Sequence, residues 1–578
     1  MPKPFDRSRV IQVALGEIPA DLVIKGANIF DSFSGRFRKG DLAVSQGYIA
    51  GIGSYSGKEE ISALDNFLLP GFLDAHVHIE SSMTTPMEFA RALNATGTTS
   101  VICDPHEIAN VAGIEGIKFF LETTEEAPID IYVMLPSCVP ASHLDSGGAT
   151  LTAEDLAPLL THPRVLGLGE MMNYPGVLTQ DAEVIRKLSL LCPDKKLLFD
   201  GHAPGVIGKA LNAYASTGIS SDHETTKAGE LTEKLSAGIF MLLREGSAAK
   251  NLVALLPAVT TYNSRFCAFA TDDRHARDLL TEGSINYLCR LALATGLIPL
   301  PDIINMASLN GALHYNLPHT GALAPGYQAD MALYSDLWSF RPTLVWKNGV
   351  NTARDGVSLV SPSLPTQNPY VRNTVRIGDI KEESLKIPGN SGEPVRVIGV
   401  LARQIITESL VIELPTLGGF ILPDPENDVA KLAVFNRYTP NATPSLGFIK
   451  NLGLKRGAIA ETVSHDSHNL IVAGVSDKDM ILAVKRIAEM EGGLVAILDG
   501  KILAELPLPV GGLMTLKSLP ETAEALALMM DSLPTLGFPV NFEPFMTLSF
   551  MSLPVIPSLK LTSQGLVDVN TFQIVPLI

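Results

Sequence analysis

The sequence lacks the closely paired cysteines that build a disulfide framework or a thiolate metal site. Its cysteines are five, an odd number, without any CxxC pair, and they stand far apart at Cys103, Cys138, Cys192, Cys267 and Cys289. Small secreted domains and structural zinc sites need thiols at short, regular spacings. Cysteine usage therefore argues against both classes and favours a protein of the reducing cytoplasm.

Features of secreted and membrane proteins are also missing. The N-terminal segment MPKPFDRSRVIQVALGEIPADL carries scattered charges and no apolar stretch before a small-residue cleavage site, so we expect no signal peptide. Apolar runs elsewhere, such as GIFMLL, are far shorter than the roughly 20 residues that cross a bilayer. We therefore expect a cytoplasmic protein that has no membrane partner.

Positive charge is scarce. The chain has 44 Lys and Arg against 61 Asp and Glu, which gives a net charge of −17. A surface of this sign repels phosphate backbones and anionic lipids, so nucleic acid is not an expected partner. Hydrophobic residues make up 46% and charged residues 18% of the chain, a balance typical of globular proteins. A small neutral substrate fits this composition better than a polyanion does.

The length of the chain predicts several domains. Its 578 residues exceed the roughly 250 to 300 residues of a single hydrophobic core, so two or three domains are expected. Residues 1–65 alternate apolar and polar positions between glycine turns, as short antiparallel strands do, and residues 321–367 repeat this pattern. We predict one composite β domain from these two segments, a catalytic domain over residues 66–320, and a separate α+β domain over residues 368–578.

Residues 66–320 contain eight short apolar runs, and nearly every one ends on a polar or ionisable residue before a helix-like stretch. The runs are FLLPGFLDAHVH, TTSVICDPHE, IDIYVMLPS, VLGLGEM, KLLFDGHA, GISSDHE, GIFMLLRE and RFCAFATDD. This cadence is that of βα units. A doubly wound open sheet has the same cadence, but the count of eight favours a TIM-type (β/α)8 barrel with its active site at the carboxyl ends of the strands. The predicted fold class is α/β.

Histidines and carboxylates stand at the ends of these runs. His76 and His78 are two residues apart on a predicted strand, so both imidazoles point to the same side. Later runs end with Glu170, His202, His223 and Asp272. Any one such histidine is more often an ordinary buried or surface residue. Six such groups at predicted strand ends, however, indicate a centre for two divalent ions, and Mn²⁺, Fe²⁺ or Zn²⁺ suits this mixture of nitrogen and oxygen ligands.

A carboxylate beside such a centre can move protons. A divalent ion lowers the pKa of water toward roughly 7, which makes hydroxide available at neutral pH. We predict that Asp272 accepts the proton of this water and passes it to the leaving group, and that Asp273 hydrogen-bonds the substrate. The alternative is that Asp272 and Asp273 only cap the following helix.

Two polar clusters fall outside the minimal metal set. Glu107, at the end of the second run, and Glu80, just after the two histidines, are rival candidates for an acid that protonates a ring nitrogen; loop capping is the alternative for both. The segment SHDSHN, near the C-terminal end, contains His465, Asp466 and His468. It could close over the mouth of the barrel, exclude water or hold a further ion, or it could be an exposed polar turn.

These motifs together resemble the bacterial-type adenine deaminases of the amidohydrolase superfamily, over essentially the whole chain. The matching segments are PGFLDAHVHIESSM, DPHEIANVAG, PSCVPAS, GHAPG, SSDHET, ATDDR and SHDSHN. The resemblance implies hydrolytic deamination of adenine to hypoxanthine and ammonia, as in purine salvage. It also implies that the six residues above are the dinuclear ligands, with manganese or ferrous iron as the expected ions.

The resemblance bears on further residues and on competing functions. Glu170 stands where many relatives carry a carbamylated lysine, which disfavours dihydroorotases and hydantoinases. We expect His106, in DPHEIANVAG, and Ser137, in PSCVPAS, to bind substrate together with Asp273, and we expect a homodimer. Two alternatives stay open. One is another amidohydrolase acting on a different nucleobase or cyclic amide, and the other is a binding protein with a decayed barrel, against which the complete ligand set argues.

Overall fold

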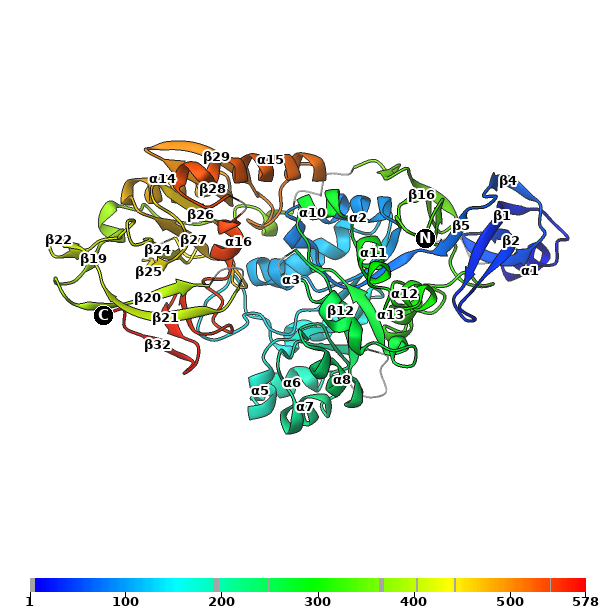
Figure 1. Cartoon of the computed structure of the whole chain (residues 1–578), viewed down its shortest axis with the longest axis horizontal. Helices are drawn as coiled ribbons and strands as arrows, with labels where there is room; N and C mark the ends of the chain where they lie inside the picture. The colour runs from blue at the N-terminus through cyan, green and yellow to red at the C-terminus, as the bar shows by residue number, and fades with distance from the viewer. Residues whose placement is uncertain are drawn as a thin grey trace.

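The computed structural model describes residues 6–190, 197–247, 249–362, 368–401, 404–440, 443–540 and 542–578. Three parts follow one another along its long axis (Figure 1). A β-sheet unit near the N-terminus lies at one end, a barrel of strands and helices lies in the middle, and a second sheet-rich region lies at the other end. The barrel therefore contacts both other parts.

The first sheet takes strands from both sides of the barrel sequence. Its members are β1 (Ala20–Asp31), β2 (Arg36–Ser45), β3 (Tyr48–Gly53), β4 (Gly57–Ser62), β5 (Phe67–Pro70), β15 (Met331–Tyr334), β16 (Pro342–Lys347), β17 (Val350–Arg354) and β18 (Val357–Ser358). Strand β5 joins the two groups, because it pairs in parallel with β1 and antiparallel with β15. The sequence pattern places Phe67–Pro70 in the first run of the barrel. In the structure these residues form β5 and belong to this first sheet.

Eight parallel strands form the central barrel. They are β6 (Phe72–His78), β7 (Thr98–Cys103), β8 (Asp130–Leu135), β9 (Val165–Met171), β10 (Leu198–Gly201), β11 (Ser221–Asp222), β12 (Phe240–Arg244) and β13 (Cys267–Ala270). Strands β6 to β10 pair in sequence order, as do β11 to β13. The Ser220 N–H donates to the Phe199 carbonyl oxygen at 2.8 Å and links β10 to β11. The prediction of a (β/α)8 barrel is confirmed.

The ring closes through a two-residue strand. Strand β14 (Asp272–Asp273) follows β13 directly and pairs in parallel with β6, with Asp272 opposite Val77. Buried Asp74 supports this closure, because its carboxylate accepts hydrogen bonds from the Thr271 N–H at 3.0 Å and from the Thr271 hydroxyl at 2.5 Å. The last predicted run therefore ends beside the first, and Asp272 lies next to the histidines of β6.

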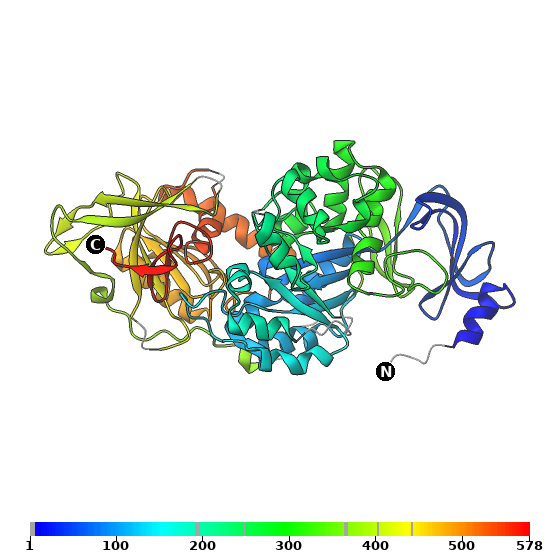
Figure 2. The same ribbon diagram turned by 90° about the horizontal axis from the view of Figure 1, so that it is seen from below.

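Helices cover the outside of the barrel (Figure 2), so its strands are buried on both faces. Every residue of β6 and of β7 is buried, as is usual for parallel strands with both faces covered. Helices α2 (Pro86–Ala95), α3 (His106–Thr123), α7 (Gly208–Ala215), α8 (Ala228–Ser236) and α11 (Ile285–Thr295) lie between successive strands or after the last one.

The C-terminal region is built on an eight-stranded sheet. Its strands, in spatial order, are β21 (Thr407–Glu413), β20 (Pro394–Val400), β25 (Ser445–Lys450), β24 (Val429–Phe435), β27 (Leu470–Gly474), β26 (Ala458–Glu461), β28 (Gly493–Leu498) and β29 (Lys501–Pro507). Helices α14 (Asp477–Glu489), α15 (Leu519–Ser532) and α16 (Pro544–Ser549) accompany it. SHDSHN lies in the connection between β26 and β27. No helix in the described part of the chain is both long and apolar enough to cross a membrane.

This region packs against the catalytic face of the barrel. The Thr515 N–H donates to the Met83 carbonyl oxygen at 2.8 Å, just beyond the end of β6. The Asn469 side-chain amide donates to the Ser146 carbonyl oxygen at 2.8 Å. These contacts hold the connection between β26 and β27 over the carboxyl ends of the barrel strands.

A buried ion-pair cluster joins the first sheet to the barrel and gives a test of the fold. Lys347 Nζ lies 2.6 Å from Asp330 Oδ2 and 2.7 Å from Asp130 Oδ2, at the start of β8. We expect Lys347→Met to lower the free energy of unfolding by about 3–5 kcal/mol, because it leaves the buried Asp330 carboxylate without its cation. The measurement is the apparent Tm in calorimetry. The control is Lys39→Met, at the exposed pair with Asp65, for which a loss of at most about 1 kcal/mol is expected. Equal Tm shifts in the two variants would contradict this account.

Candidate active site

The six residues predicted as metal ligands converge at the carboxyl ends of the barrel strands. They are His76, His78, Glu170, His202, His223 and Asp272. Within subsets of three, their ligand atoms all lie within 4.8 Å of one another. The Nε2 atoms of His76 and His78 are 3.2 Å apart, as the spacing of two residues on one strand predicts. The structure therefore gathers this set, spread over roughly two hundred residues, in one place.

The Glu170 carboxylate faces histidines with both oxygens. Oε1 lies 3.3 Å from His78 Nε2, whereas Oε2 lies 2.5 Å from His202 Nδ1 and 3.3 Å from His223 Nε2. Burial alone would raise the pKa of Glu170, but the surrounding imidazoles, His223 and His202 foremost, hold it well below the usual range. An ionised carboxylate between two groups of imidazoles can be shared by two cations.

The backbone around Glu170 is fixed on both sides. The Glu170 N–H donates to Asp104 Oδ2 at 2.9 Å, and the Ser137 hydroxyl donates to the Glu170 carbonyl oxygen at 2.6 Å. A side chain at Gly169 would collide with the Asp104 carboxylate, which accounts for the glycine in VLGLGEM. Ser137 thus lies behind Glu170 and orients it, while its predicted contact with substrate stays a prediction.

Asp272 divides its two oxygens between the histidines and an arginine. Oδ1 lies 3.0 Å from His78 Nε2 and 3.6 Å from His76 Nε2, whereas Oδ2 accepts a hydrogen bond from Arg244 Nη1 at 2.8 Å. Burial raises the pKa of Asp272, but Arg244 and the two histidines outweigh it and hold the pKa well below its usual range. The backbone has φ 58° at Asp272, a strained conformation for a residue with a side chain. The backbone is therefore strained at the residue whose carboxylate enters the site.

The donor set fits divalent metal ions. His78 Nδ1 lies 2.9 Å from the Asp104 carbonyl oxygen; it donates to that oxygen, so the Nε2 lone pair points into the site, as in metal-ligating histidines. The Nε2 atoms of His76 and His78 face each other and nearby carboxylates, an arrangement that a shared cation stabilises. Imidazole nitrogens with carboxylate oxygens suit Mn²⁺, Fe²⁺ or Zn²⁺. These residues can therefore hold a cation pair.

The remaining residues predicted to bind substrate lie beside this set. His106 Nδ1 is 3.3 Å from Glu170 Oε1, and its ring meets that of His78 at a centroid distance of 4.4 Å. Asp273 Oδ1 accepts a hydrogen bond from the Ser81 hydroxyl at 2.5 Å. Burial and neighbouring Asp272 raise the pKa of Asp273. The side chains of Asp272 and Asp273 therefore have different surroundings. The Asp272 carboxylate contacts His76 and His78, whereas Asp273 lines a cavity.

SHDSHN reaches the barrel and surrounds Glu107. His465, Asp466 and His468 are all buried, so the segment is not an exposed turn. His465 Nδ1 lies 3.0 Å from Glu107 Oε1, and His468 Nε2 lies 3.3 Å from Glu107 Oε2. Burial works against the charge on Glu107, but the two histidines hold its pKa well below the usual range.

His465 and His468 lie beside the Glu107 carboxylate, and the three residues form a group that could hold a cation. The Ser464 N–H donates to His468 Nδ1 at 3.2 Å, and His468 Nε2 lies 3.3 Å from Glu107 Oε2 without a hydrogen bond to it. Burial lowers the pKa of His468 to about 4, which keeps the ring neutral. His468 therefore contacts Glu107 as a neutral imidazole.

Glu80 lies close to Glu107 but has different partners. Its Oε1 accepts a hydrogen bond from the Ile108 N–H at 3.0 Å, while Oε2 is buried without a hydrogen bond. Burial, with a further contribution from Glu107, raises the pKa of Glu80 to about 7. The two rival glutamates therefore sit side by side in opposite electrostatic surroundings.

Sequence reasoning missed three charged residues of the site. Arg244 holds Asp272, and it also pairs with Glu224, with 3.0 Å between Nη2 and Oε2. Asp104 receives the Glu170 N–H. Arg244 is the last residue of β12, so the signal that selected the other residues, a polar side chain at a strand end, was present there too.

Comparisons with known proteins agree with this geometry. Residues 67–352 match the amidohydrolase family, and residues 404–573 match the adenine deaminase C-terminal domain. Adenine deaminase 2 of Carboxydothermus hydrogenoformans is 50% identical to this chain, covering 98% of it and 99% of the relative. The chain belongs to the adenine deaminase family. The resemblance drawn from the motifs is thereby confirmed, and so is its classification as a hydrolase of the amidohydrolase superfamily, whose members depend on metals.

A second curated relative and a solved structure are also similar to this chain. The adenine deaminase of Desulfatibacillum aliphaticivorans is 44% identical over 98% of this chain and 99% of that protein. Among solved structures, a β-aspartyl dipeptidase of Fervidobacterium islandicum AW-1 is similar over 59% of this chain and 98% of its own, with 16% identity and a TM-score of 0.45.

The cluster around Glu107 gives a test of the C-terminal contribution to the site. We expect His468→Leu to lower adenine turnover about tenfold or more, because the buried Glu107 carboxylate loses a polar neighbour. His468→Gln keeps a polar group at this position and should retain most of the activity. Ammonia release and metal content are measured together, with exposed His143→Leu as the control. Equal losses in the Leu and Gln variants would show that a polar side chain facing Glu107 is not what matters.

Proposed function

We propose that this protein hydrolyses adenine to hypoxanthine and ammonia, as a purine-salvage enzyme. The observation that carries the proposal is the convergence of four histidines and two carboxylates at the mouth of the barrel, in a chain that belongs to the adenine deaminase family. Adenine is small and uncharged, which fits a protein with net charge −17 that disfavours nucleic acid. The homodimer expected from the sequence stays a prediction.

The six ligands fall into two groups that share Glu170. His76, His78 and Asp272 form one group, and His202 and His223 form the other. We propose that they hold two Mn²⁺ or Fe²⁺ ions, with Zn²⁺ as the alternative. Bound divalent ions supply positive charge that lowers the pKa of a neighbouring water toward roughly 7 and polarises the group attacked. All other steps depend on side chains of this chain.

Asp272 is the proposed proton carrier. It accepts the proton of the water that attacks C6 of adenine and delivers it to the departing amino group, so that water and adenine become hypoxanthine and ammonia. Its second oxygen is held by Arg244 at 2.8 Å, which fixes the carboxylate and keeps one oxygen directed at the reacting atoms. Asp273 and His106 are proposed to bind the base.

A second proton must reach a ring nitrogen as C6 becomes tetrahedral, and its donor recovers a proton from the C6 hydroxyl group as ammonia leaves. Glu107 and Glu80 are the two proposed donors, and both are buried near the histidines of the site. Burial raises the pKa of Glu80 to about 7, which suits a donor, whereas two imidazoles hold the pKa of Glu107 well below its usual range, so Glu107 must first receive a proton from one of them. They differ in their partners, since Glu107 contacts two imidazoles and Glu80 contacts a backbone N–H. Glu→Gln substitution at each position separates them, because only the donor's replacement removes the corresponding limb of the pH–rate profile.

The proposed activity is tested with a panel of bases and with metal removal. We expect ammonia release from adenine and none from guanine, cytosine or adenosine. Chelation should abolish turnover, and Mn²⁺ or Fe²⁺ should restore it, because the ligands have no substitute source of charge. Metal content is measured on protein purified without air. Activity confined to a cyclic amide would defeat the proposal in favour of the rival amidohydrolase function.

The role of Asp272 has its own test. We expect Asp272→Asn to reduce kcat by about 10²–10⁴-fold, because the amide cannot accept the proton of water. Bound metal is quantified in the same samples, so that loss of proton transfer is separated from loss of a ligand. Asp65→Asn, at an exposed position of the first sheet, serves as the control. Near-normal turnover of the Asp272 variant at full metal content would refute the assignment.

A further inference from the structure

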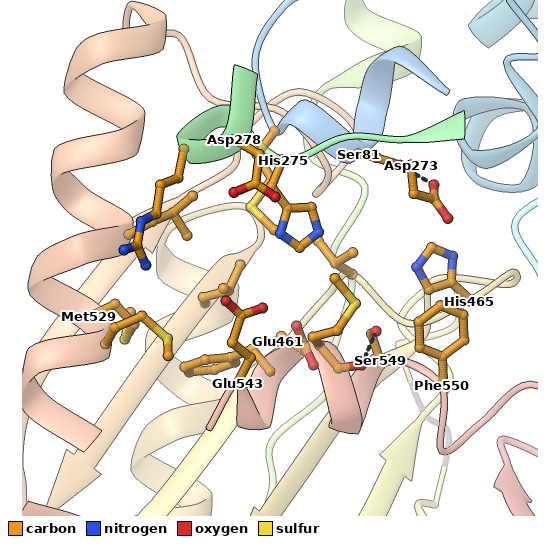
Figure 3. A pocket seen from close by; sticks show the side chains of 18 residues that line it. Ser81, Asp273, His275, Asp278, Glu461, His465, Met529, Glu543, Ser549 and Phe550 are labelled. Atoms are coloured by element: carbon orange, nitrogen blue, oxygen red, sulfur yellow. Dashed lines mark hydrogen bonds between the residues drawn. The ribbon is translucent and has the colours of Figure 1, made fainter. Parts of the chain in front are cut away.

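A cavity of about 80 Å³ lies between the barrel and the C-terminal region. Its barrel wall is polar and carries Ser81 and Asp273. Its C-terminal wall is largely apolar and includes Met529, Met546 and Phe550. Figure 3 shows the side chains of both walls around one space. Polarisable sulfur and aromatic side chains of this kind suit the flat faces of an aromatic ring.

One end of this cavity opens toward the proposed metal ligands. A carboxylate oxygen of Asp273 lies within 4.8 Å of ligand atoms of His78 and Asp272. His465 also lines the cavity, and its ring stacks on Phe550 with a centroid distance of 4.6 Å and an interplanar angle of 17°. A molecule in the cavity can therefore present one edge to the reacting centre while its opposite edge faces the C-terminal wall.

Glu461, the last residue of β26, is an unusual member of that wall. Its side chain is buried, with 1% of the residue exposed. Its Oε1 has no hydrogen-bond partner, and among the described residues no cation pairs with its carboxyl group. Burial raises its pKa well above the usual range, which favours the neutral carboxylic acid. Figure 3 shows it across the cavity from Ser81 and Asp273.

We propose that this cavity binds the purine, and that the buried carboxyl group of Glu461 pairs with the N3 and N9–H edge of the base. This inference rests on the proposed function and adds a specificity-determining residue from the C-terminal region. An unpartnered polar group in an apolar wall costs free energy that a matching ligand recovers. In this proposal, N3 and N9–H of the bound base are the hydrogen-bond partners of Glu461.

The chemistry of the two groups is complementary. A neutral carboxyl group offers an O–H donor beside a C=O acceptor, whereas adenine has the acceptor N3 beside the donor N9–H. N3 lies opposite C6 in the six-membered ring, so this pairing directs C6 toward Asp273 and the metal ligands. In a nucleoside, N9 carries a sugar and has no N–H. Glu461 therefore selects the free base, because a buried donor–acceptor pair rejects an analogue that cannot complete it.

The test compares two substitutions at the same position. We expect Glu461→Leu to raise KM for adenine about tenfold or more, with kcat changed by less than about threefold, since the lost contacts are made equally before and during reaction. Glu461→Gln should stay near the wild-type KM, because an amide also offers one donor beside one acceptor. Glu408→Leu, an exposed position on β21 of the same sheet, is the control and should leave both constants unchanged.

Equilibrium binding of 9-methyladenine completes the test. The wild-type protein should bind it about tenfold or more weakly than adenine, and Glu461→Leu should narrow this gap, because the methyl group and the substitution remove the same hydrogen bond. Equal wild-type affinities for the two bases would overturn the inference even if the Leu variant failed to fold. An unchanged KM in a folded, metal-loaded Leu variant would also overturn it. Absence of wild-type turnover of adenine would instead defeat the proposed function.

Discussion

The structure of the site depends on the carboxylate of Glu170. Buried imidazoles surround it, with His202 Nδ1 at 2.5 Å from one oxygen and His78 Nε2 at 3.3 Å from the other. Four buried histidines lie close together here, and of the carboxylates around them Glu170 is the one that faces His78, His202 and His223 at once. The negative charge of Glu170 makes the gathering favourable, and Asp104 and Ser137 fix the backbone that carries it. A lysine would need a further chemical modification to supply such a charge, whereas glutamate carries it directly.

Barrel closure supplies the second carboxylate. Because β14 pairs with β6, Asp272 arrives beside His76 and His78 from the far end of the barrel sequence. Its left-handed backbone and its contact with Arg244 direct one oxygen at the histidines. The barrel thus provides the ligands by its own topology, while the C-terminal region covers the mouth and contributes His465, His468 and one wall of a cavity. The residues around the site therefore come from both the barrel and the C-terminal region.

Much of this architecture could be predicted from sequence. Eight apolar runs gave the barrel, because parallel strands with both faces covered are apolar throughout, and polar residues at their ends meet at one face. Arg244 also lies at the end of a barrel strand, but it was not predicted as a site residue because an arginine is not a metal ligand. The contact between Glu107 and His465 spans more than three hundred residues, so no local pattern encodes it. In the segment AIAE, the pattern gives Glu461 no feature that separates it from other strand residues. Only the structure of the cavity between the barrel and the C-terminal region shows that Oε1 of its carboxyl group lacks a partner.

The first sheet has a consequence for synthesis of the chain. Pro70 of β5 pairs with Met331 of β15, which leaves the ribosome roughly 260 residues later. At about 5–20 residues per second, the interval is on the order of 13 to 50 seconds. During that time β5 is an open strand edge, and such edges recruit other chains. Strand β5 is therefore a segment that chaperones can protect during synthesis. This need ends only after the barrel has been fully translated and β15 has been made.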